Sequence, residues 1–318
     1  MRILVTSVPS TGHIHPMMPL VLGLQRAGHD VAWATGLKAK ATIEGYGIPV
    51  HTSGAAPIAT SRGIPHITFA FSGAPSATML GGIEEAVAGL WSAEGLAVPS
   101  DAGLYAHLYL HRFPPAFGLV PSGVNVRFVR PVGFDGSTTA EKPNWLDSLG
   151  SEGSAVYLTL GTVVTGPDQW RKILAAVASI NIDVIATTGS QDPADIGPVP
   201  PNVRVERYVP QSFILDRVTA MISHGGAGTI LAGASQGVPQ VCIPMGADQW
   251  ENADALAGTG ASITLEEDQR DSATIAGALE RQLEGDNFEA AAHTVAAEIA
   301  ALPHPDEYIS VCGPLVSG

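Results

Sequence analysis

In the first forty residues, short apolar runs alternate with a segment whose apolar residues recur at the spacing of a helix. Arg2 to Thr6 is apolar and β-branched and predicts a strand, and 30–35 predicts a second one. Between them a loop runs to His15, and a helix is expected over about 16–27, ended by Gly28. The order strand, helix, strand predicts a parallel sheet covered by helices.

The middle of the chain has a weaker pattern. A turn feeding a strand is expected at 63–69, a helix at 77–96 and a strand at 126–131. Residues 99–123 lack a clear period and are expected to form a loop. The polar, Gly-containing stretch 135–143 is expected to be a linker between domains.

Strand and helix patterns alternate plainly in the second half. Strands are expected at 155–160, 183–187, 203–206, 220–222 and 240–243, and helices at 168–179, 228–236, 249–258 and, rich in Ala, across 272–301. Each half therefore predicts a doubly wound, Rossmann-like α/β domain, with a ligand crevice between the two. We expect one domain at 1–140, a second at 141–301, and a tail at 302–318 that packs back on the first.

Composition excludes several classes of protein. Of 318 residues, 45% are hydrophobic and 14% charged, which is typical of globular domains. The net charge of −14 argues against a nucleic-acid partner, because phosphate binding needs a basic face. Cys242 and Cys312 have no metal-ligand spacing. No apolar run approaches the roughly 20 residues of a membrane span, so no membrane partner is expected and the expected location is the cytoplasm.

The most informative segment lies between the strand at 220–222 and the following helix. It reads Ser223-His224-Gly225-Gly226-Ala227-Gly228-Thr229. Glycines let a backbone approach a ligand closely, and a helix N-terminus turns its N–H groups toward an anion. A histidine at the strand end adds a donor for a phosphate oxygen. The glycines alone fit equally well a turn that only packs the helix on the sheet.

Further motifs surround this segment in a fixed order. Tyr208-Val209-Pro210-Gln211 precedes it, and Gly237-Val238-Pro239, Pro244 and Asp248-Gln249-Trp250-Glu251-Asn252-Ala253 follow it. The ordered set resembles the donor-binding signature of the nucleotide-sugar-dependent glycosyltransferases of the GT-B fold. It is most similar to the bacterial branch that glycosylates macrolides, aromatic polyketides and other antibiotics. The resemblance covers roughly Ala155 to Thr264 and Met1 to Gly36.

The resemblance implies a role for each matching residue. Tyr208 would lie against the base, Val209 would offer its backbone to the base edge, and Gln211 would lie at the ribose side. The diphosphate would be held by His224, Gly226, Gly228, Thr229 and Thr162. Asp248 and Gln249 would bond the sugar hydroxyls, although Asp248 also suits an N-cap of the next helix.

No metal and no cofactor beyond the UDP- or TDP-sugar donor is expected, since N–H groups and hydroxyls can stabilise a departing diphosphate. The acceptor is expected to be a small natural product of polyketide, macrolide or phenolic type. An auxiliary activator protein is not indicated.

The N-terminal match centres on Gly12-His13-Ile14-His15-Pro16. It implies that His13 faces the cleft and removes the proton of the acceptor, a task suited to a neutral imidazole with a pKa near 6.5. His15 is a competing candidate, and a structural or acceptor-lining role is favoured for it. Trp91 and Phe113 are expected in the core rather than at an acceptor.

The chain departs from the family in its first half. Full-length relatives carry, before the segment that resembles 63–67, a long acceptor-binding stretch and a strand whose Asp orients the catalytic histidine. Residues 54–62 stand in its place, and no residue matches that Asp. Three alternatives stay open: another carboxylate substitutes, with Asp101 a weak candidate; His13 acts unassisted at a lower rate; or the protein binds a donor without efficient turnover.

Two functions therefore compete. The first is a metal-independent, inverting glycosyltransferase with His13 as general base. The second is a degenerate donor-binding or auxiliary relative with little or no transferase activity. A dinucleotide-dependent oxidoreductase is excluded, because the loop at 7–13 lacks the Gly-x-Gly-x-x-Gly pattern.

Overall fold

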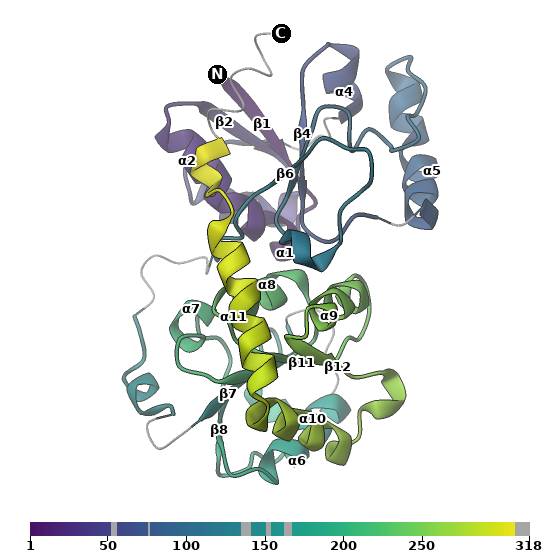
Figure 1. Cartoon of the computed structure of the whole chain (residues 1–318). Coiled ribbons are helices and arrows are strands. Elements are labelled where there is room, and N and C mark those ends of the chain that lie inside the picture. Colours follow the sequence, from purple (N-terminus) through teal and green to yellow (C-terminus); the bar gives the residue numbers. More distant parts are fainter. Residues whose placement is uncertain (52–55, 76, 135–140, 151–153, 162–166, 309–318) are drawn as a thin grey trace. The chain divides into compact units, whose positions relative to one another are not determined.

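The computed structural model describes residues 1–51, 56–75, 77–134, 141–150, 154–161 and 167–308 (Figure 1). The chain forms two compact units. The first comprises Met1–Pro115, Leu119–Phe134 and the chain from Leu302 onward, and the second comprises Ala116–Gly118 and Asp135–Ala301. Within the described residues, no helix has the length and apolar character needed to cross a membrane.

The second unit is built on one parallel sheet of six strands. These are β7 (Ala155–Thr159), β8 (Asp183–Thr187), β9 (Val203–Glu206), β10 (Ala220–Ser223), β11 (Gln240–Cys242) and β12 (Ser262–Thr264). Their spatial order is β12-β11-β10-β7-β8-β9, and every pair is parallel. The first strand therefore lies beside the fourth, and this reversal of direction between β7 and β10 is where open α/β sheets bind ligands.

Both faces of this sheet are buried, as a parallel sheet requires. Val156 and Leu158 of β7 belong to one core with α6 (Pro167–Ala178) and α10 (Ser272–Glu284), whereas Tyr157 belongs to a second core on the other face. Further helices of the unit are α7 (Gln211–Ile214), α8 (Ala227–Ser235), α9 (Gln249–Gly258) and α11 (Asp286–Ala301), with short turns η4 (Asn144–Ser148), η5 (Pro193–Asp195) and η6 (Glu267–Gln269). The expected Rossmann-like pattern of the second half is present.

The first unit contains two separate parallel sheets of three strands each. One has β1 (Arg2–Thr6), β2 (Asp30–Ala34) and β3 (Val50–His51), in that order. The other has β4 (Ile67–Ala70), β5 (Leu108–His111) and β6 (Val126–Phe128). One side of β1 pairs with β2 and one side of β4 with β5, and within the described residues the other side of each strand carries no partner strand.

The two sheets share one hydrophobic core despite this break. Val5 of β1 and Leu110 of β5 are buried in the same cluster, and Ile67 and Phe69 of β4 pack against it. The helices of the unit are α1 (Thr11–Ile14), α2 (Met18–Arg26), α3 (Lys40–Glu44), α4 (Ala56–Ser61) and α5 (Ala77–Ala93), with short turns η1 (His15–Met17) and η2 (Leu37–Ala39). The short turn η3 (Pro115–Phe117) begins in the first unit and ends in the second. The surface of this unit remains partly apolar, since Leu4 of β1 is 51% exposed.

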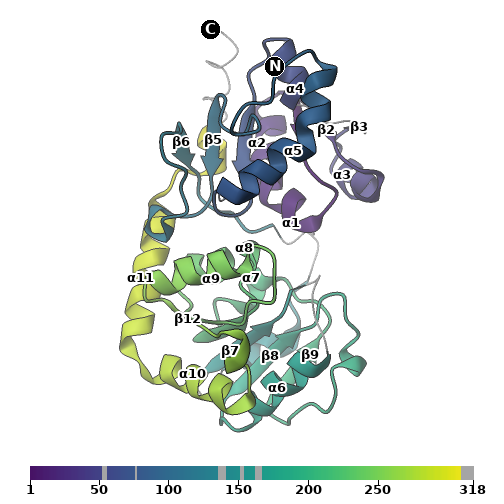
Figure 2. The same cartoon turned by 90° about the vertical axis from the view of Figure 1, so that its right-hand side faces the viewer.

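The end of the described chain returns to the first unit. η7 (Pro305–Tyr308) packs beside α2, where Arg26 forms an ion pair with Asp306 at 3.0 Å (Figure 2). The Tyr308 hydroxyl donates a hydrogen bond to the carbonyl of Phe128, next to β6. Residues 302–308 are thereby fastened to two elements of the first unit.

Several short elements were not expected, among them α3, β3, α4 and β12, and three further differences have a physical reason. The supposed loop at 99–123 contains β5, whose four residues are all buried, so the strand shows no alternation from which to recognise it. The loop expected before residue 16 contains α1, and the expected helix at 16–27 consists of η1 and α2. Pro16 and Pro19 each lie in a first turn, where their missing N–H is tolerated. The Ala-rich helix is broken at Gly285, where a Cβ atom would lie 2.8 Å from the carbonyl of Arg281.

Candidate functional site

Two loops meet at the reversal point of the six-stranded sheet. Thr159 ends β7 and is paired in register with Ser223, which ends β10. Gly161 follows the first strand and His224 the second. The two segments that the sequence marks for diphosphate binding are therefore adjacent, at the carboxyl ends of neighbouring strands, although Thr162 itself lies outside the described residues.

Several glycines of these loops are required by the packing of the chain itself. A Cβ atom on Gly161 would lie 2.6 Å from Nε2 of His224, and one on Gly226 would lie against the same atom. Gly225 has φ +82°, and a Cβ there would lie 2.8 Å from the carbonyl oxygen of Gln249. For these three positions the packing explanation of the motif is therefore sufficient.

Gly228 is different, because a Cβ there would meet nothing within 4 Å and the residue is exposed. It lies in the first turn of α8, whose first helical hydrogen bond runs from Ile230 N to Gly226 O at 2.9 Å. Among the described residues, no hydrogen bond takes up the N–H groups of Ala227, Gly228 or Thr229. These amides are what a helix N-terminus offers to an anion.

His224 is held in its neutral form beside these amides. Burial lowers its pKa to about 4, an effect only partly offset by the charge of Asp248 and by a hydrogen bond to the backbone of Thr159. Its Nδ1 atom is buried and has no partner among the described residues. With one nitrogen bonded to Thr159, Nδ1 donates to a phosphate oxygen only after the ring gains a proton or changes tautomer.

Asp248 and Gln249 lie in the turn after β11, at the start of α9. Gln249 is 8% exposed, and its Oε1 atom accepts hydrogen bonds from the backbone N–H of Met245 (2.7 Å) and Gly246 (3.3 Å). Asp248 occupies the N-cap position without a capping bond. Ala247, directly before Asp248, has φ +54°, in the left-handed region that a residue with a Cβ rarely adopts. Gln249 thus stabilises a strained turn, whether or not it also contacts a sugar.

Asn252 is a site residue to which the sequence pattern assigned no role. It is fully buried, and its Nδ2 atom donates to Asp248 Oδ2 at 2.9 Å and to the carbonyl of Gly225 at 3.3 Å. It therefore ties the Asp248 turn to the glycine loop. The sequence could have indicated this role, because Asn252 follows Asp248 by four residues and the two therefore lie on one face of a helix.

The segment expected at the base follows the edge strand β9. Tyr208 is 61% exposed, whereas Val209 is buried. Gln211 begins α7, and its Nε2 atom donates to the Tyr157 hydroxyl at 3.4 Å. An exposed aromatic ring beside buried backbone suits a surface on which a flat base stacks.

His13 lies in the first unit, on α1 after β1. Its ring centroid is 3.9 Å from that of Phe71, with an angle of 37° between the planes. His15 contacts Phe134 edge-on at 5.2 Å instead. The carboxylate of Asp101 accepts hydrogen bonds from the backbone N–H of Gly103 (2.9 Å) and Tyr105 (3.2 Å), so it holds its own turn.

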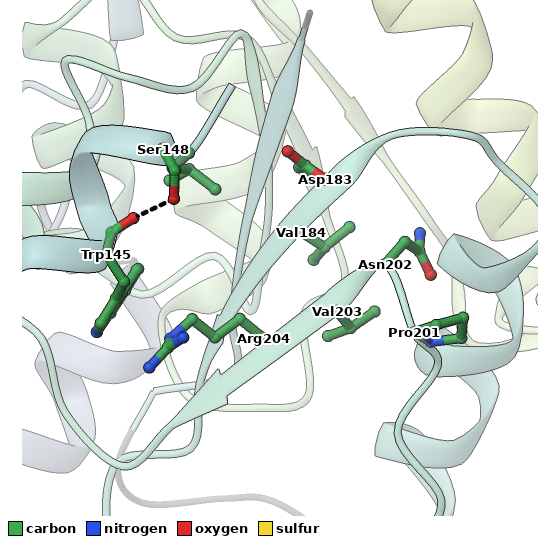
Figure 3. Close-up of a pocket in the computed structure, with 9 residues that line it drawn as sticks. Trp145, Ser148, Asp183, Val184, Pro201, Asn202, Val203 and Arg204 are labelled. Carbon is green, nitrogen blue, oxygen red and sulfur yellow. Dashed lines mark hydrogen bonds between the residues drawn. The ribbon is translucent and has the colours of Figure 1, made fainter. Parts of the chain in front are cut away.

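A cavity of about 370 Å³ lies elsewhere in the second unit (Figure 3). It is lined by η4 and by the first residues of two strands, Asp183 of β8 and Val203 of β9. There the Arg204 guanidinium lies 4.1 Å from the centre of the Trp145 ring and donates from Nε to Glu206 at 2.8 Å. This cavity is at the amino ends of the strands, whereas the His224 loop is at their carboxyl ends, so we assign the candidate site to the loop.

Comparison with known proteins adds independent evidence. A family model described as Erythromycin biosynthesis protein CIII-like, C-terminal domain, matches residues 171–315. The L-demethylnoviosyl transferase of Streptomyces niveus is 27% identical over 370 aligned positions, covering 96% of each chain. The solved structure of the glycosyltransferase VinC in complex with DTDP superimposes with a TM-score of 0.85 at 23% identity, over 100% of both chains. The chain is thus similar to bacterial antibiotic glycosyltransferases, and it has the GT-B fold of the solved neighbours.

The chain matches only part of the length of several relatives. The alignment with the Streptomyces niveus protein has 370 positions against 318 residues here, so part of that relative has no counterpart. The 4'-demethylrebeccamycin synthase of Lentzea aerocolonigenes is 32% identical over 201 residues, which are 61% of this chain but 46% of that protein. The chain thus spans about half the length of several relatives that it matches. The expected fold, two Rossmann-like α/β domains, is confirmed. The Streptomyces niveus relative is named as a transferase and VinC as a glycosyltransferase.

Proposed function

We propose that this protein transfers a sugar from a UDP- or TDP-sugar to a small natural-product acceptor, with inversion and without a metal ion. The observation that carries the proposal is the first turn of α8. Its N–H groups at Ala227, Gly228 and Thr229 have no hydrogen-bond partner among the described residues, and they lie at the reversal point of a doubly wound sheet. Such amides stabilise a departing diphosphate without rearrangement of the protein.

The donor would be held by residues from four strand ends. Tyr208, Val209 and Gln211 would take the base and ribose, and His224, Gly226, Gly228, Thr229 and Thr162 the diphosphate. Asp248 would take a sugar hydroxyl, and its carboxylate is oriented by Asn252. Gln249 would use its amide N–H groups for the sugar, since its carbonyl oxygen serves the turn.

His13 would act as the general base. An imidazole nitrogen takes the proton of the acceptor nucleophile, whose electron pair forms the new bond to the anomeric carbon. The bond between that carbon and the diphosphate oxygen breaks on the opposite face, and the diphosphate leaves with the electron pair. His13 then returns its proton to solvent. Attack from the face opposite the leaving group inverts the anomeric configuration.

A second function has one specific observation in its favour. The first unit has two open strand edges, β1 and β4, and the sequence lacks the Asp-bearing strand that the resemblance implies before residues 63–67. A protein without that strand fits a degenerate, donor-binding or auxiliary role. Its signature is nucleotide binding with no sugar transfer.

One experiment separates the two functions. The wild-type protein is incubated with UDP- and TDP-sugars and a panel of polyketide, macrolide and phenolic acceptors, and both transfer and donor hydrolysis are measured. Transfer that falls by 10²- to 10⁴-fold in His13→Ala supports the transferase, because general-base catalysis has that magnitude. His15→Ala is the matched control and retains activity. Nucleotide binding without transfer, unchanged in His13→Ala, supports the auxiliary role.

A further inference from the structure

The His13 ring has an aromatic neighbour that the sequence pattern did not mark. The Phe71 centroid lies 3.9 Å from that of His13, with 37° between the planes, so the two rings overlap rather than meet edge to edge. Phe71 is 41% exposed, although it is a large apolar side chain. One part of its ring therefore covers the imidazole, and the remainder faces solvent.

The backbone on both sides of Phe71 is anchored. Ala70 ends β4 and is paired in register with His111 of β5. On the other side, Ala74 N donates to the carbonyl of Leu119 at 3.2 Å. A Cβ atom on Gly73 would lie 3.1 Å from the Leu119 side chain, so this short loop lies close against its neighbour. The position of the Phe71 ring is thus fixed by the second sheet of the first unit.

The backbone of His13 is anchored independently by the first sheet. The N–H groups of His13 and Ile14 both donate to the carbonyl of Ser10 at 3.0 Å, and Ile14 is buried. Ser7 N donates to the carbonyl of Ala34 at 3.2 Å, while the Ser7 hydroxyl accepts from the Trp33 indole at 3.0 Å. The loop before α1, the helix that carries His13, is therefore held on β2.

The stacked pair joins segments that follow two different sheets. β1 leads into the loop before α1, which carries His13, and β4 leads directly into Phe71, while neither strand pairs with the other. The ring contact therefore connects the two sheets of the first unit.

We propose that Phe71 is the positioning residue of His13 and an apolar platform for the acceptor. This inference rests on the proposed function. The Phe71 ring limits rotation of the imidazole and offers an electron-rich face to the imidazolium that forms when His13 takes a proton. Its exposed part, together with Val8, which is 51% exposed in the loop before His13, favours a flat, apolar or aromatic acceptor.

The positioning role is tested first by NMR, without any substrate. The imidazole C–H resonances of His13, assigned with His13→Gln, are followed through a pH titration in wild type, Phe71→Leu and Phe71→Tyr. Phe71→Leu is expected to remove the ring-current shift and to lower the pKa of His13, and Phe71→Tyr to retain both. Phe134→Leu, which removes the aromatic partner of His15, is the control and leaves the His13 signals in place. His13 resonances that are the same in wild type and Phe71→Leu would overturn the proposal.

The second arm measures transfer to the acceptor that the activity panel identifies. Phe71→Leu is expected to lower kcat by about ten- to hundredfold through misplacement of the base, and to raise the KM of aromatic acceptors more than that of small aliphatic alcohols. Phe71→Tyr is expected to keep both kcat and the KM of aromatic acceptors near their wild-type values. An unchanged kcat in Phe71→Leu refutes the catalytic consequence. If wild type transfers no sugar, the proposed function fails, whereas the NMR result still decides whether Phe71 positions His13.

Discussion

A Cβ atom on Gly161 would lie 2.6 Å from Nε2 of His224, so the loop after β7 and the loop after β10 touch through this pair. Gly161 also has φ +77°, a backbone conformation that favours glycine. The place of His224 thus depends on the absence of one methyl group in another loop. Gly161 is therefore a glycine that the fold requires, whereas Gly228, where a Cβ would meet nothing within 4 Å, is one that only a ligand would require.

Gly161→Ala should destabilise the second unit. The left-handed backbone costs alanine about 1–2 kcal/mol, and displacement of His224 adds about 1–3 kcal/mol of overpacking strain. Thermal unfolding measures the loss as a lower Tm. Gly228→Ala is the matched control, with free space at its Cβ. It should leave the Tm unchanged or raise it, and yet weaken diphosphate binding. An equal loss of stability in both variants would contradict the distinction.

His224 should make the folded protein less stable at acid pH. Because burial lowers its pKa from 6.5 to about 4, the unfolded state binds a proton more readily than the folded state between these values. The stabilisation is complete above pH 6.5 and is lost as the pH falls toward 4, by about 3 kcal/mol for this group. Urea unfolding at pH 7 and pH 4.5 is compared in wild type and His224→Gln. The variant lacks this part of the decline, and identical declines would show that His224 titrates normally.

Gln249 should have a structural role distinct from any role at the sugar. Gln249→Ala leaves the N–H groups of Met245 and Gly246 without their acceptor and should cost about 1–3 kcal/mol. Gln249→Glu keeps an acceptor oxygen and should unfold near wild type. The affinity of Gln249→Glu is then measured for a nucleoside diphosphate and for the corresponding nucleotide sugar. The difference between the two affinity losses reports the contact with the sugar. Equal affinity losses for both ligands would argue against a contact between Gln249 and the sugar.

Asn252 should couple the Asp248 turn to the glycine loop. Asn252→Ala removes two hydrogen bonds from a buried amide, and leaves the carbonyl of Gly225 without this donor. We expect a loss of about 1–3 kcal/mol of stability and a weaker binding of the complete donor. Asn252→Asp keeps the volume but places a carboxylate against Asp248, and should be worse. A neutral effect of both substitutions would remove Asn252 from the site.

Much of the second unit could be predicted from the sequence, because its strands and helices alternate with clear turn residues between them. The expected helix at 228–236 is α8 at Ala227–Ser235, and the expected strand at 183–187 is β8. β5 was missed since a fully buried strand of four residues has neither alternation nor length to mark it.

The position of the motif residues in the fold was predictable, but their contacts were not. The order of the motifs places His224 just before one helix and Gly228 in its first turn, as α8 has them. It did not show that Gly161 and Gly226 serve the His224 ring, that Gln249 bonds its own turn, or that Phe71 covers His13. Those relationships join residues far apart in sequence, and their distances depend on tertiary packing, which no local pattern records.

The most direct test of the account is a crystal structure of the chain with thymidine or uridine diphosphate. The account predicts that the terminal phosphate oxygens lie within about 3.2 Å of the N–H groups of Gly228 and Thr229, beside His224. A nucleotide bound instead in the cavity lined by Trp145 and Arg204, or an α8 N-terminus that stays without phosphate at saturating nucleotide, would contradict it.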